Sequence, residues 1–370
     1  MCLIIEGKCN RAQIFTESLD EATEEQIRTL CDLDYLAQSK IRVMPDVHAG
    51  VGCTIGTTMT LHGRVAPNMV GVDIGCGMTA IRLARRKANL DRLDAFIREN
   101  IPVGRAVRHK PHERAASLDL TALRCFAHIN AARARASVGT LGGGNHFIEL
   151  DRGEDEALYL VIHSGSRHLG VEVAEYYQKE GYQRLDADAQ KSLSKALAYV
   201  EGDLFDDYLH DMGLVQRFAA LNRRAMAEDI LDGLNWEEDE RFETIHNYID
   251  LDAMILRKGA VSAKEGERLL IPINMRDGSL LCEGLGNEEW NCSAPHGAGR
   301  LMSRTEAQNR VTLKAFKDSM KGIYTTCVSK DTLDESPMAY KPMEDILRFV
   351  QPTVRVTQRL LPIYNFKAGE

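Results

Sequence analysis

The chain has no long apolar run. No stretch of about 18 apolar residues occurs among its 370 residues, so the sequence predicts no membrane-spanning helix. The opening MCLIIEGKCNRAQ lacks the basic segment and long apolar segment of a secretory signal. The nine cysteines are scattered and form no CxxC pair, which indicates neither a zinc ribbon nor a disulfide framework. We therefore expect a protein of the reducing cytoplasm.

The sequence also lacks a Pro-rich linker, an internal repeat and a low-complexity tract. A chain of this length can bury a large core, in one large domain or in two. No shift in composition marks a boundary, so we expect a single domain over residues 1–370. Apolar residues make up 44% and charged residues 27%, which predicts an ordinary globular protein.

Positive charge is not in excess. The formal net charge is −8, which alone argues mildly against a nucleic-acid partner. A local basic groove can nevertheless exist on an acidic protein. Two basic stretches are candidates, and a solvated face is the alternative for each: Arg82, Arg85, Arg86 and Lys87, then Arg105, Arg108, His109, Lys110, His112 and Arg114.

Short β-type segments bounded by Gly, Pro or Asp recur along the chain. They are Ile41–Met44, Met78–Leu83, Phe147–Leu150, Leu158–His163, Leu269–Ile273 and Ser279–Cys282. Between about 170 and 234, apolar residues recur at helical spacing instead, which predicts a helical insertion. A further helix is predicted from about Thr305 to Met320. The expected fold class is α/β, with a sheet core, surrounding helices and that insertion.

Six glycine-rich turns carry polar residues, most with a His, Cys or Asp at the apex. They are MPDVHAGVG (44–52), GVDIGCGM (71–78), LGGGNHFIE (141–149), HSGSRHLG (163–170), IHN (245–247) and SAPHGAGR (293–300). Glycine allows positive φ and close approach of the backbone to a ligand. Packing alone does not readily explain six such turns, so we expect the functional groups there.

A metal site is one interpretation of five of these residues: Asp73, Cys76, His146, His163 and His246. Taken singly, the cysteine is compatible with a small buried apolar residue and each histidine with a structural role. Together they supply N, O and S ligands from four segments. Cys and His favour Zn²⁺, whereas Asp73 and the nearby Glu149 leave room for Mn²⁺. These residues alone leave the metal open.

His296 lies in a turn with Gly297 and Gly299, before a predicted helix. Backbone N–H groups of such a turn and a helix dipole favour a phosphate, and Arg300 and Arg304 can add bidentate contacts. A neutral imidazole beside a phosphate can act as a nucleophile and form a phosphoramidate. A further metal ligand or a structural turn are the alternatives.

A series of motifs resembles that of the RtcB RNA ligases, in the family's order from about residue 41 to the end. The motifs are PDVHAG (45–50), GVDIGCGM (71–78), GGGNHFIE (142–149), HSGSR (163–167), HN (246–247), HGAGR (296–300) and DESPMAYK (334–341). One such motif is weak evidence, but seven in register are specific. The resemblance implies the compact single-domain α/β fold of that family.

The resemblance also implies roles for individual residues. It implies a site for two Mn²⁺ ions, bridged by Cys76 and held by Asp73, Cys76, His146, His163 and His246. It implies that His296 takes GMP from GTP and that Arg167 and Arg300 serve the phosphate or the RNA. The guanylate contacts that it implies are Asn145, Glu149, Gly297, Ala298, Gly299, Tyr340 and Lys367. The IPINMRDG segment (271–278) departs from the PGSMG form of some members and puts Asn274 in place of its serine, as a further nucleotide contact.

The implied activity is GTP- and Mn²⁺-dependent joining of RNA 3′-phosphate or 2′,3′-cyclic phosphate ends to 5′-hydroxyl ends, in RNA repair or tRNA splicing. The resemblance leaves open whether an archease-like activator takes part. One alternative is a dinuclear metal-dependent RNA cyclic phosphodiesterase, which would not need His296, Tyr340 or Lys367. Another is a non-catalytic RNA-binding relative, against which the full set of ligands argues.

Overall fold

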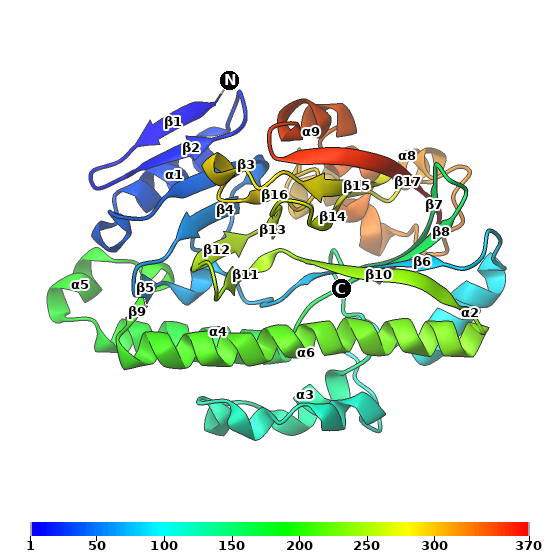
Figure 1. The fold of residues 1–370 in the computed structure, drawn as a ribbon, viewed down its shortest axis with the longest axis horizontal. Coiled ribbons are helices and arrows are strands. Elements are labelled where there is room, and N and C mark those ends of the chain that lie inside the picture. The colour runs from blue at the N-terminus through cyan, green and yellow to red at the C-terminus, as the bar shows by residue number, and fades with distance from the viewer. Residues whose placement is uncertain (1, 369–370) are drawn as a thin grey trace.

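The computed structural model describes residues 2–368. Its larger sheet has seven strands, each antiparallel to its neighbours, in the order β10-β6-β8-β7-β17-β15-β14. The bounds are β10 Glu238–Ile245, β6 Gly77–Leu83, β8 Leu158–Ser164, β7 Phe147–Gly153, β17 Val354–Lys367, β15 Gly278–Gly284 and β14 Arg268–Asn274. Figure 1 shows this sheet curling beside the second, N-terminal sheet.

The second sheet has six strands in the order β1-β2-β3-β4-β12-β11. Their bounds are β1 Leu3–Glu6, β2 Arg11–Ile14, β3 Ile41–His48, β4 Ile55–Thr60, β12 Ile255–Lys258 and β11 Asn247–Asp250. Two short pairs complete the strands: β13 (Ala260–Ser262) with β16 (Ser293–Pro295), and β5 (Arg64–Val65) with β9 (Val200–Glu201). The strands and helices confirm the mixed α/β expectation.

Two long helices run along one side of the sheets (Figure 1). The longest, α6 (Asp203–Leu234), has 32 residues and buries Tyr208, Met212 and Val215 among others at helical spacing. It ends at Asn235, whose left-handed conformation (φ 56°) closes the last turn. The other α-helices are α1 Glu21–Cys31, α2 Leu90–Asn100, α3 Ala131–Ser137, α4 Arg167–Arg184, α5 Ala187–Ser192, α7 Arg304–Arg310, α8 Leu313–Ser319 and α9 Met343–Val350.

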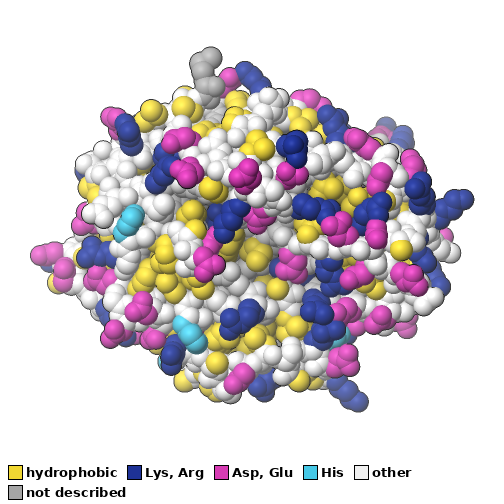
Figure 2. Space-filling model, viewed as in Figure 1, with side chains coloured by type: hydrophobic (Ala, Val, Ile, Leu, Met, Phe, Trp, Pro, Cys, Tyr) yellow, Lys and Arg dark blue, Asp and Glu magenta, His cyan; other side chains and the backbone are white. Residues whose placement is uncertain are grey.

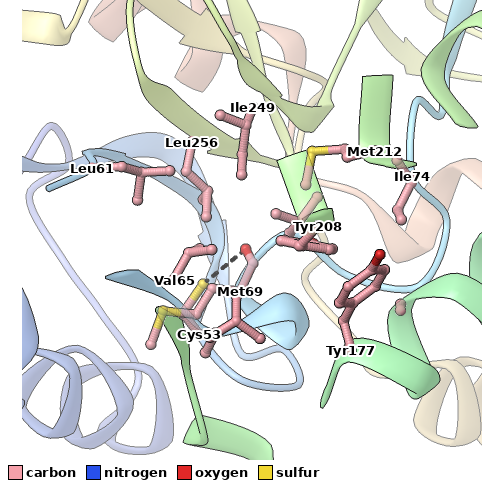
Figure 3. Close-up of a cluster of buried hydrophobic side chains, with 14 of the residues drawn as sticks. Cys53, Leu61, Val65, Met69, Ile74, Tyr177, Tyr208, Met212, Ile249 and Leu256 are labelled. Carbon is pink, nitrogen blue, oxygen red and sulfur yellow. Dashed lines mark hydrogen bonds between the residues drawn. The ribbon is translucent and has the colours of Figure 1, made fainter. Parts of the chain in front are cut away.

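One apolar core lies between the six-stranded sheet and helices α4 and α6. Figure 3 shows Leu61, Ile249 and Leu256 from the sheet side facing Tyr177 of α4 and Tyr208 of α6. The Cys53 thiol is buried there and donates to the Met69 carbonyl at 3.5 Å. A second core joins the C-terminal half of α6 to the larger sheet, through residues such as Met226, Ile148 and Ile162.

All six predicted β segments are strands. The region around 170–234 is mainly helical, as predicted, and also contains the two-residue strand β9. The single helix predicted over Thr305–Met320 is wrong, because α7 and α8 are separate helices. Val311 is extended between them, and the Thr312 hydroxyl accepts from the Ala315 N–H to begin α8. Within residues 2–368 no helix is both long and apolar enough to cross a membrane.

Candidate metal and nucleotide site

Four neighbouring strands bring the proposed ligands to one edge of the larger sheet. Cys76 directly precedes β6, His146 precedes β7, His163 is near the end of β8, and His246 follows β10. The register pairs Met78 of β6 and Phe147 of β7 with His163 on either side. Because the strands alternate in direction, starts and ends meet at the same edge. Ligands that are 170 residues apart in sequence therefore become neighbours.

The Asp73–Cys76 turn lies against α6. The Cys76 N–H donates to the Asp73 carbonyl at 3.1 Å. Gly75 has φ +71°, and a Cβ there would lie 3.0 Å from the Ala219 Cβ and 3.0 Å from the Gln216 Cα of α6. Glycine thus allows both the turn and its close approach to the helix.

The donor atoms form a continuous row. The Asp73 Oδ2 lies 3.0 Å from the His146 Nε2, which lies 3.5 Å from the Cys76 Sγ. The Cys76 Sγ is 3.3 Å from the His163 Nε2, and that atom is 3.3 Å from the His246 Nε2. Donor atoms of Cys76, His146 and His163 all lie within 4.8 Å of one another. All five residues called metal ligands are thus brought together, with Cys76 near the middle of the row.

The far sides of two rings fix their orientation. The His146 Nδ1 lies 2.8 Å from the Leu141 carbonyl, and the His163 Nδ1 lies 3.1 Å from the Asn145 carbonyl. Each Nδ1 therefore carries the proton, and each Nε2 presents a lone pair to the row. The His246 Nδ1 has no partner among the residues that the structure describes.

This arrangement fits divalent cations. Unprotonated nitrogens, a sulfur and a carboxylate oxygen face one another at close range, which is unfavourable unless positive charge lies between them. Burial, and then the His296 and His146 neighbours respectively, lower the pKa values of His246 and His163 well below 6.5, so both rings are neutral. Burial opposes the ionisation of Asp73, but when the His146 Nε2 carries a proton instead of facing a cation, its hydrogen bond and charge lower the pKa of Asp73 to about 2. A bound dication takes the place of that proton.

The Cys76 thiol needs a cation in order to ionise. Burial and then the Asp73 carboxylate raise its pKa well above 9. A bound dication reverses that preference, because thiolate coordination releases the proton. The donor set of N, S and O is compatible with several transition metals and does not by itself choose among them.

His296 follows β16 at the other end of the row, with its ring centroid 5.0 Å from that of His246. Its Nδ1 lies 2.7 Å from the Oδ2 of Asp46, which is fully buried on β3, and its backbone N–H donates to the same oxygen at 3.2 Å. The Nδ1–H is thereby engaged, and Nε2 is left as the free ring nitrogen. Asp46 lies in the PDVHAG motif, but the sequence alone gave it no role, because nothing in the sequence links it to His296.

A pocket opens beside His296. It is lined by Asn145, Phe147, Glu149, His163, His246, Pro272, Ile273, Asn274, Met275, His296, Ala298, Tyr340 and Lys367. Of the residues called guanylate contacts, all except Gly297 and Gly299 line it. Gly299 has φ +73°, and a Cβ there would lie 2.4 Å from the Asp46 carbonyl oxygen.

The wall at Lys367 contains an ion-pair cluster centred on buried Glu335. Lys367 and Arg304 pair with its carboxylate, and the Tyr340 hydroxyl donates to it at 2.7 Å. Arg300 packs over the Tyr340 ring with its guanidinium carbon 5.0 Å from the centroid. Arg300 also lies 3.5 Å from the Glu335 carboxylate. The sequence did not reveal this role of Glu335 in the DESPMAYK motif, since only the fold shows that these three cations and the Tyr340 phenol converge on it.

Glu149 and Asn274 are already engaged within the protein. Burial raises the pKa of Glu149, and Asn365 donates to its carboxylate. The Asn274 amide bonds Asp277 at 2.8 Å and its oxygen accepts from the Arg276 and Asp277 N–H groups, so this side chain closes the β14–β15 turn. Asn145 follows the glycine run and precedes His146.

A second cleft also borders the ligands. Asp73, Cys76, Asn145, His246 and His296 line it, together with Lys258 and the apolar Val51, Ile55 and Val72 among others. Burial lowers the pKa of Lys258, whose ammonium donates to the Asn68 carbonyl at 2.9 Å. The pocket and this cleft therefore share three lining residues, Asn145, His246 and His296.

The remaining predicted residues flank this centre. Arg167 begins α4 and donates to the Gly104 carbonyl at 2.6 Å. Arg300 donates to the Asp334 carbonyl at 2.6 Å and lines a different cleft, with His48 and Lys341. The helix predicted to follow the His296 turn from about Thr305 is α7, which starts at Arg304, where the Ser303 hydroxyl accepts from the Glu306 N–H.

Two further buried residues of α6 were missed by sequence reasoning. Arg223 donates to the carbonyls of Gly75 at 2.8 Å and Ser164 at 3.0 Å, next to Cys76 and His163. The Asn222 amide bonds the backbone of Gly139 and Thr140. Both read as ordinary polar helix residues in the sequence, and only their burial reveals that they hold the ligand loops.

Comparison with known proteins identifies similar chains. A family model described as tRNA-splicing ligase RtcB matches residues 26–368. The RNA-splicing ligases RtcB1 of Escherichia coli ATCC 25922 and RtcB of E. coli K12 are each 34% identical over 368 residues, covering 88% of this chain and 90% of the relative. The tRNA-splicing ligase RtcB of Aeropyrum pernix is 25% identical over 420 residues, covering 87% and 86%. The match begins before residue 41, where the motif series starts.

Proposed function

Because the chain belongs to the RtcB tRNA-splicing ligase family, we propose that this RNA ligase uses GTP and two Mn²⁺ ions to join a 3′-phosphate or 2′,3′-cyclic phosphate end to a 5′-hydroxyl end. The reaction passes through GMP bound to His296. The observation that carries the proposal is the placement of His296. Asp46 engages its Nδ1, and its ring borders both the pocket and the row of metal-ligand side chains.

Asp73, Cys76, His146, His163 and His246 would hold the cations, with the Cys76 sulfur shared between them. Their donor atoms are close enough for two ions to use common ligands. Bound in this way, the cations supply positive charge that offsets charge on the phosphate oxygens. The Asp73 carboxylate suits Mn²⁺, and the imidazole and thiolate ligands also accept other divalent metals.

The pocket would take the guanosine of GTP. Its walls include the rings of Phe147 and Tyr340 with Ile273 and Met275, which suit a flat purine. Glu149 and Lys367 supply polar groups at the wall of the pocket. The α-phosphate would then lie near the His296 Nε2, on the side of the pocket formed by the ligand histidines.

The steps follow from which atoms can act as nucleophiles. Water first opens a cyclic phosphate to a 3′-phosphate. The His296 Nε2 then attacks the α-phosphorus of GTP, forming a P–N bond as pyrophosphate leaves, while Asp46 holds the Nδ1 proton and offsets the positive charge of the ring. An oxygen of the RNA 3′-phosphate displaces the imidazole from that phosphorus. The 5′-hydroxyl finally attacks the activated RNA phosphorus and GMP leaves.

Activation by GMP explains why a nucleotide is needed. A phosphate monoester dianion is a poor electrophile, and its oxygens are poor leaving groups. Linking it to GMP converts one oxygen into a good leaving group. The second cleft, which shares Asn145, His246 and His296 with the guanosine pocket, would admit the RNA ends. RNA repair or tRNA splicing is the corresponding role, with or without an archease-like activator.

The test combines two measurements on the full chain. Incubation with α-labelled GTP and a panel of divalent metals should transfer label to the wild type as an acid-labile adduct, best with Mn²⁺. His296→Ala should abolish the transfer and retain metal. An RNA bearing a 2′,3′-cyclic phosphate and a 5′-hydroxyl should be ligated by the wild type alone. Cyclic-phosphate opening without guanylation would instead identify a phosphodiesterase.

A further inference from the structure

Two arginines lie side by side at the Asp73 end of the ligand row. Arg167 donates to the Gly104 carbonyl at 2.6 Å, and Arg133 of α3 donates to the next carbonyl, that of Arg105, at 3.4 Å. Successive carbonyls of one segment therefore hold two guanidinium groups. Burial and the nearby Arg133 charge act to lower the pKa of Arg167, and Asp73 opposes them.

The fold makes specific room for Arg167. Its backbone has φ +56°, a strained value for a residue with a side chain. A Cβ on Gly142 would lie 1.8 Å from the Arg167 Nη1 and 2.6 Å from the His146 Nδ1. Only glycine at this position therefore lets the guanidinium lie next to a ligand histidine.

Nearby arginines behave differently. Arg108, Arg114 and Arg124 each pair with a carboxylate of α6: Asp229, Glu228 and Asp207. Within residues 2–368, neither Arg133 nor Arg167 has a carboxylate at ion-pair distance, and the buried Nε of Arg133 has no hydrogen-bond partner. The Asp73 charge acts on Arg167 only from beyond that distance. Two like charges placed together with no directly paired carboxylate are unfavourable, so the arrangement suits an anion that binds between them.

We propose that Arg133 joins Arg167 in holding a backbone phosphate of the RNA, at a site next to the Asp73 end of the ligand row. The guanidinium groups match phosphate geometry. This proposal rests on the RNA ligase function given above. It adds Arg133, on which neither the motif series nor the family resemblance bears.

A neighbouring phosphate fits this place better than the reacting one. His296 and Asp73 occupy opposite ends of the row, with His246, His163, Cys76 and His146 between them. A 3′-phosphate that attacks guanylated His296 cannot lie between the arginines at the same time. The bound group is therefore a phosphodiester of either the 3′-phosphate strand or the 5′-hydroxyl strand.

The negative net charge of the protein does not exclude an RNA contact at these two arginines. Figure 2 shows acidic and basic side chains interspersed over the visible face, in keeping with a formal net charge of −8. Recognition of a strand would then depend on a few arginines placed without acidic partners. Phosphate contacts of this kind position a strand without reading its sequence.

The test compares Arg133→Ala with Arg135→Ala. Arg135 lies on the same short helix, faces the cleft lined by His112 and Asp119, and serves as the matched control. Anisotropy of labelled single-stranded RNA measures binding without any reaction, once with a 3′-phosphate strand and once with a 5′-hydroxyl strand. Label transfer from GTP is measured in parallel, and thermal unfolding reports folding.

Arg133→Ala should weaken binding of one of the two strands about tenfold and reduce the slope of log affinity against log salt by roughly 0.7. Its rate of guanylation should stay within twofold of the wild type, and Arg133→Lys should recover part of the binding. Arg135→Ala should change neither property. The strand that loses affinity identifies which RNA carries the phosphate.

Unchanged binding of both strands with an unchanged salt slope would overturn the proposal, and so would an equal loss in Arg135→Ala. A loss of guanylation that matches the loss of RNA binding would also overturn it, by placing the GTP phosphates at the arginines instead. Should the wild type bind RNA and yet take no GMP, the proposed function fails while the binding comparison still tests Arg133.

Discussion

The Asp46 carboxylate accepts both the ring Nδ1–H and the backbone N–H of His296, at 2.7 and 3.2 Å. The two residues are 250 positions apart in sequence, and the carboxylate has no exposed surface. One oxygen thus fixes both the rotation of the ring and the position of the turn that carries it. A ring held in this way presents Nε2 with its lone pair, as a nucleophile requires.

Replacing Asp46 should therefore slow the first chemical step. Asp46→Ala is expected to lower the rate of label transfer from GTP to the protein by about 100-fold. Without the carboxylate, nothing fixes the proton on the His296 Nδ1, and no negative charge offsets the positive charge that the ring gains in the reaction. Asp46→Asn should lower the rate less. The backbone N–H of His296 can still donate to the side-chain oxygen of the new asparagine, which keeps that oxygen beside the ring Nδ1. Single-turnover guanylation measures both rates.

Asp188→Ala is the control for this comparison, because that carboxylate is exposed on α5. Metal content should remain near the wild-type ratio in all three variants. A wild-type rate of guanylation in Asp46→Ala would show that the ring is positioned by other contacts.

Cys76 is expected to be the ligand whose loss removes both cations. Its sulfur lies between the His146 and His163 Nε2 atoms, at 3.5 and 3.3 Å. Cys76→Ala should reduce bound Mn²⁺ from about two ions per chain to near background and abolish ligation, since the shared ligand is gone. Cys282→Ala, at another buried cysteine, controls for loss of a thiol from the core. If elemental analysis finds one Mn²⁺ ion per chain still bound to Cys76→Ala, the sulfur is a ligand of one ion and is not shared by two.

The strands were predictable because short apolar segments bounded by Gly, Pro or Asp are a local signal. Ile41–Met44 and Leu158–His163 lie inside β3 and β8 on that basis. The break between α7 and α8 was not predictable from spacing, since the apolar residues of α8 continue the helical pattern past Val311. Capping by the Thr312 hydroxyl and the packing of Phe316 decide the break instead.

The candidate ligands were predictable as residue types in glycine-rich turns, and their meeting was not. The antiparallel order β10-β6-β8-β7 brings them to one edge, and no local pattern encodes that order. Asp46 and Arg223 were missed for a related reason. Each acts through a contact with a residue distant in sequence, and each looks locally like part of a strand or a helix.

The Glu335 cluster should make stability depend on pH in a defined direction. Burial opposes ionisation, yet the Lys367 and Arg304 charges lower the pKa of Glu335 to about 2, from an ordinary value of 4.5. The ionised carboxylate therefore stabilises the folded state. Its contribution, about 3 kcal/mol, is fully present above roughly pH 5 and is lost as pH falls toward 2.

Urea unfolding of the wild type and Glu335→Gln across that range measures this contribution. The unfolding free energy of the wild type minus that of Glu335→Gln should be constant near neutral pH and should shrink below about pH 5. Glu344→Gln on α9, whose side chain is exposed, is the comparison variant. A difference that stays constant down to the acid limit of the folded state would contradict the assigned linkage.

Arg223 should couple the stability of the fold to metal affinity. Its side chain is fully buried and bonds the Gly75 and Ser164 carbonyls, directly before Cys76 and after His163, and it pairs with Glu243 at 3.2 Å. Arg223→Met keeps most of the volume but leaves these acceptors buried and unpaired. We expect a loss of about 3 kcal/mol in unfolding free energy and about tenfold weaker Mn²⁺ binding.

Arg224→Met is the matched control, because the next residue of the same helix carries an exposed guanidinium paired with Glu228. It should change stability by less than about 1 kcal/mol and leave the metal affinity unaltered. The decisive measurement is a Mn²⁺ titration of each folded variant, below its unfolding temperature. If Arg223→Met loses stability yet binds Mn²⁺ as tightly as the wild type, the ligand loops hold their geometry without this arginine. A parallel loss of both would mean that the buried guanidinium positions Cys76 and His163 for the cations.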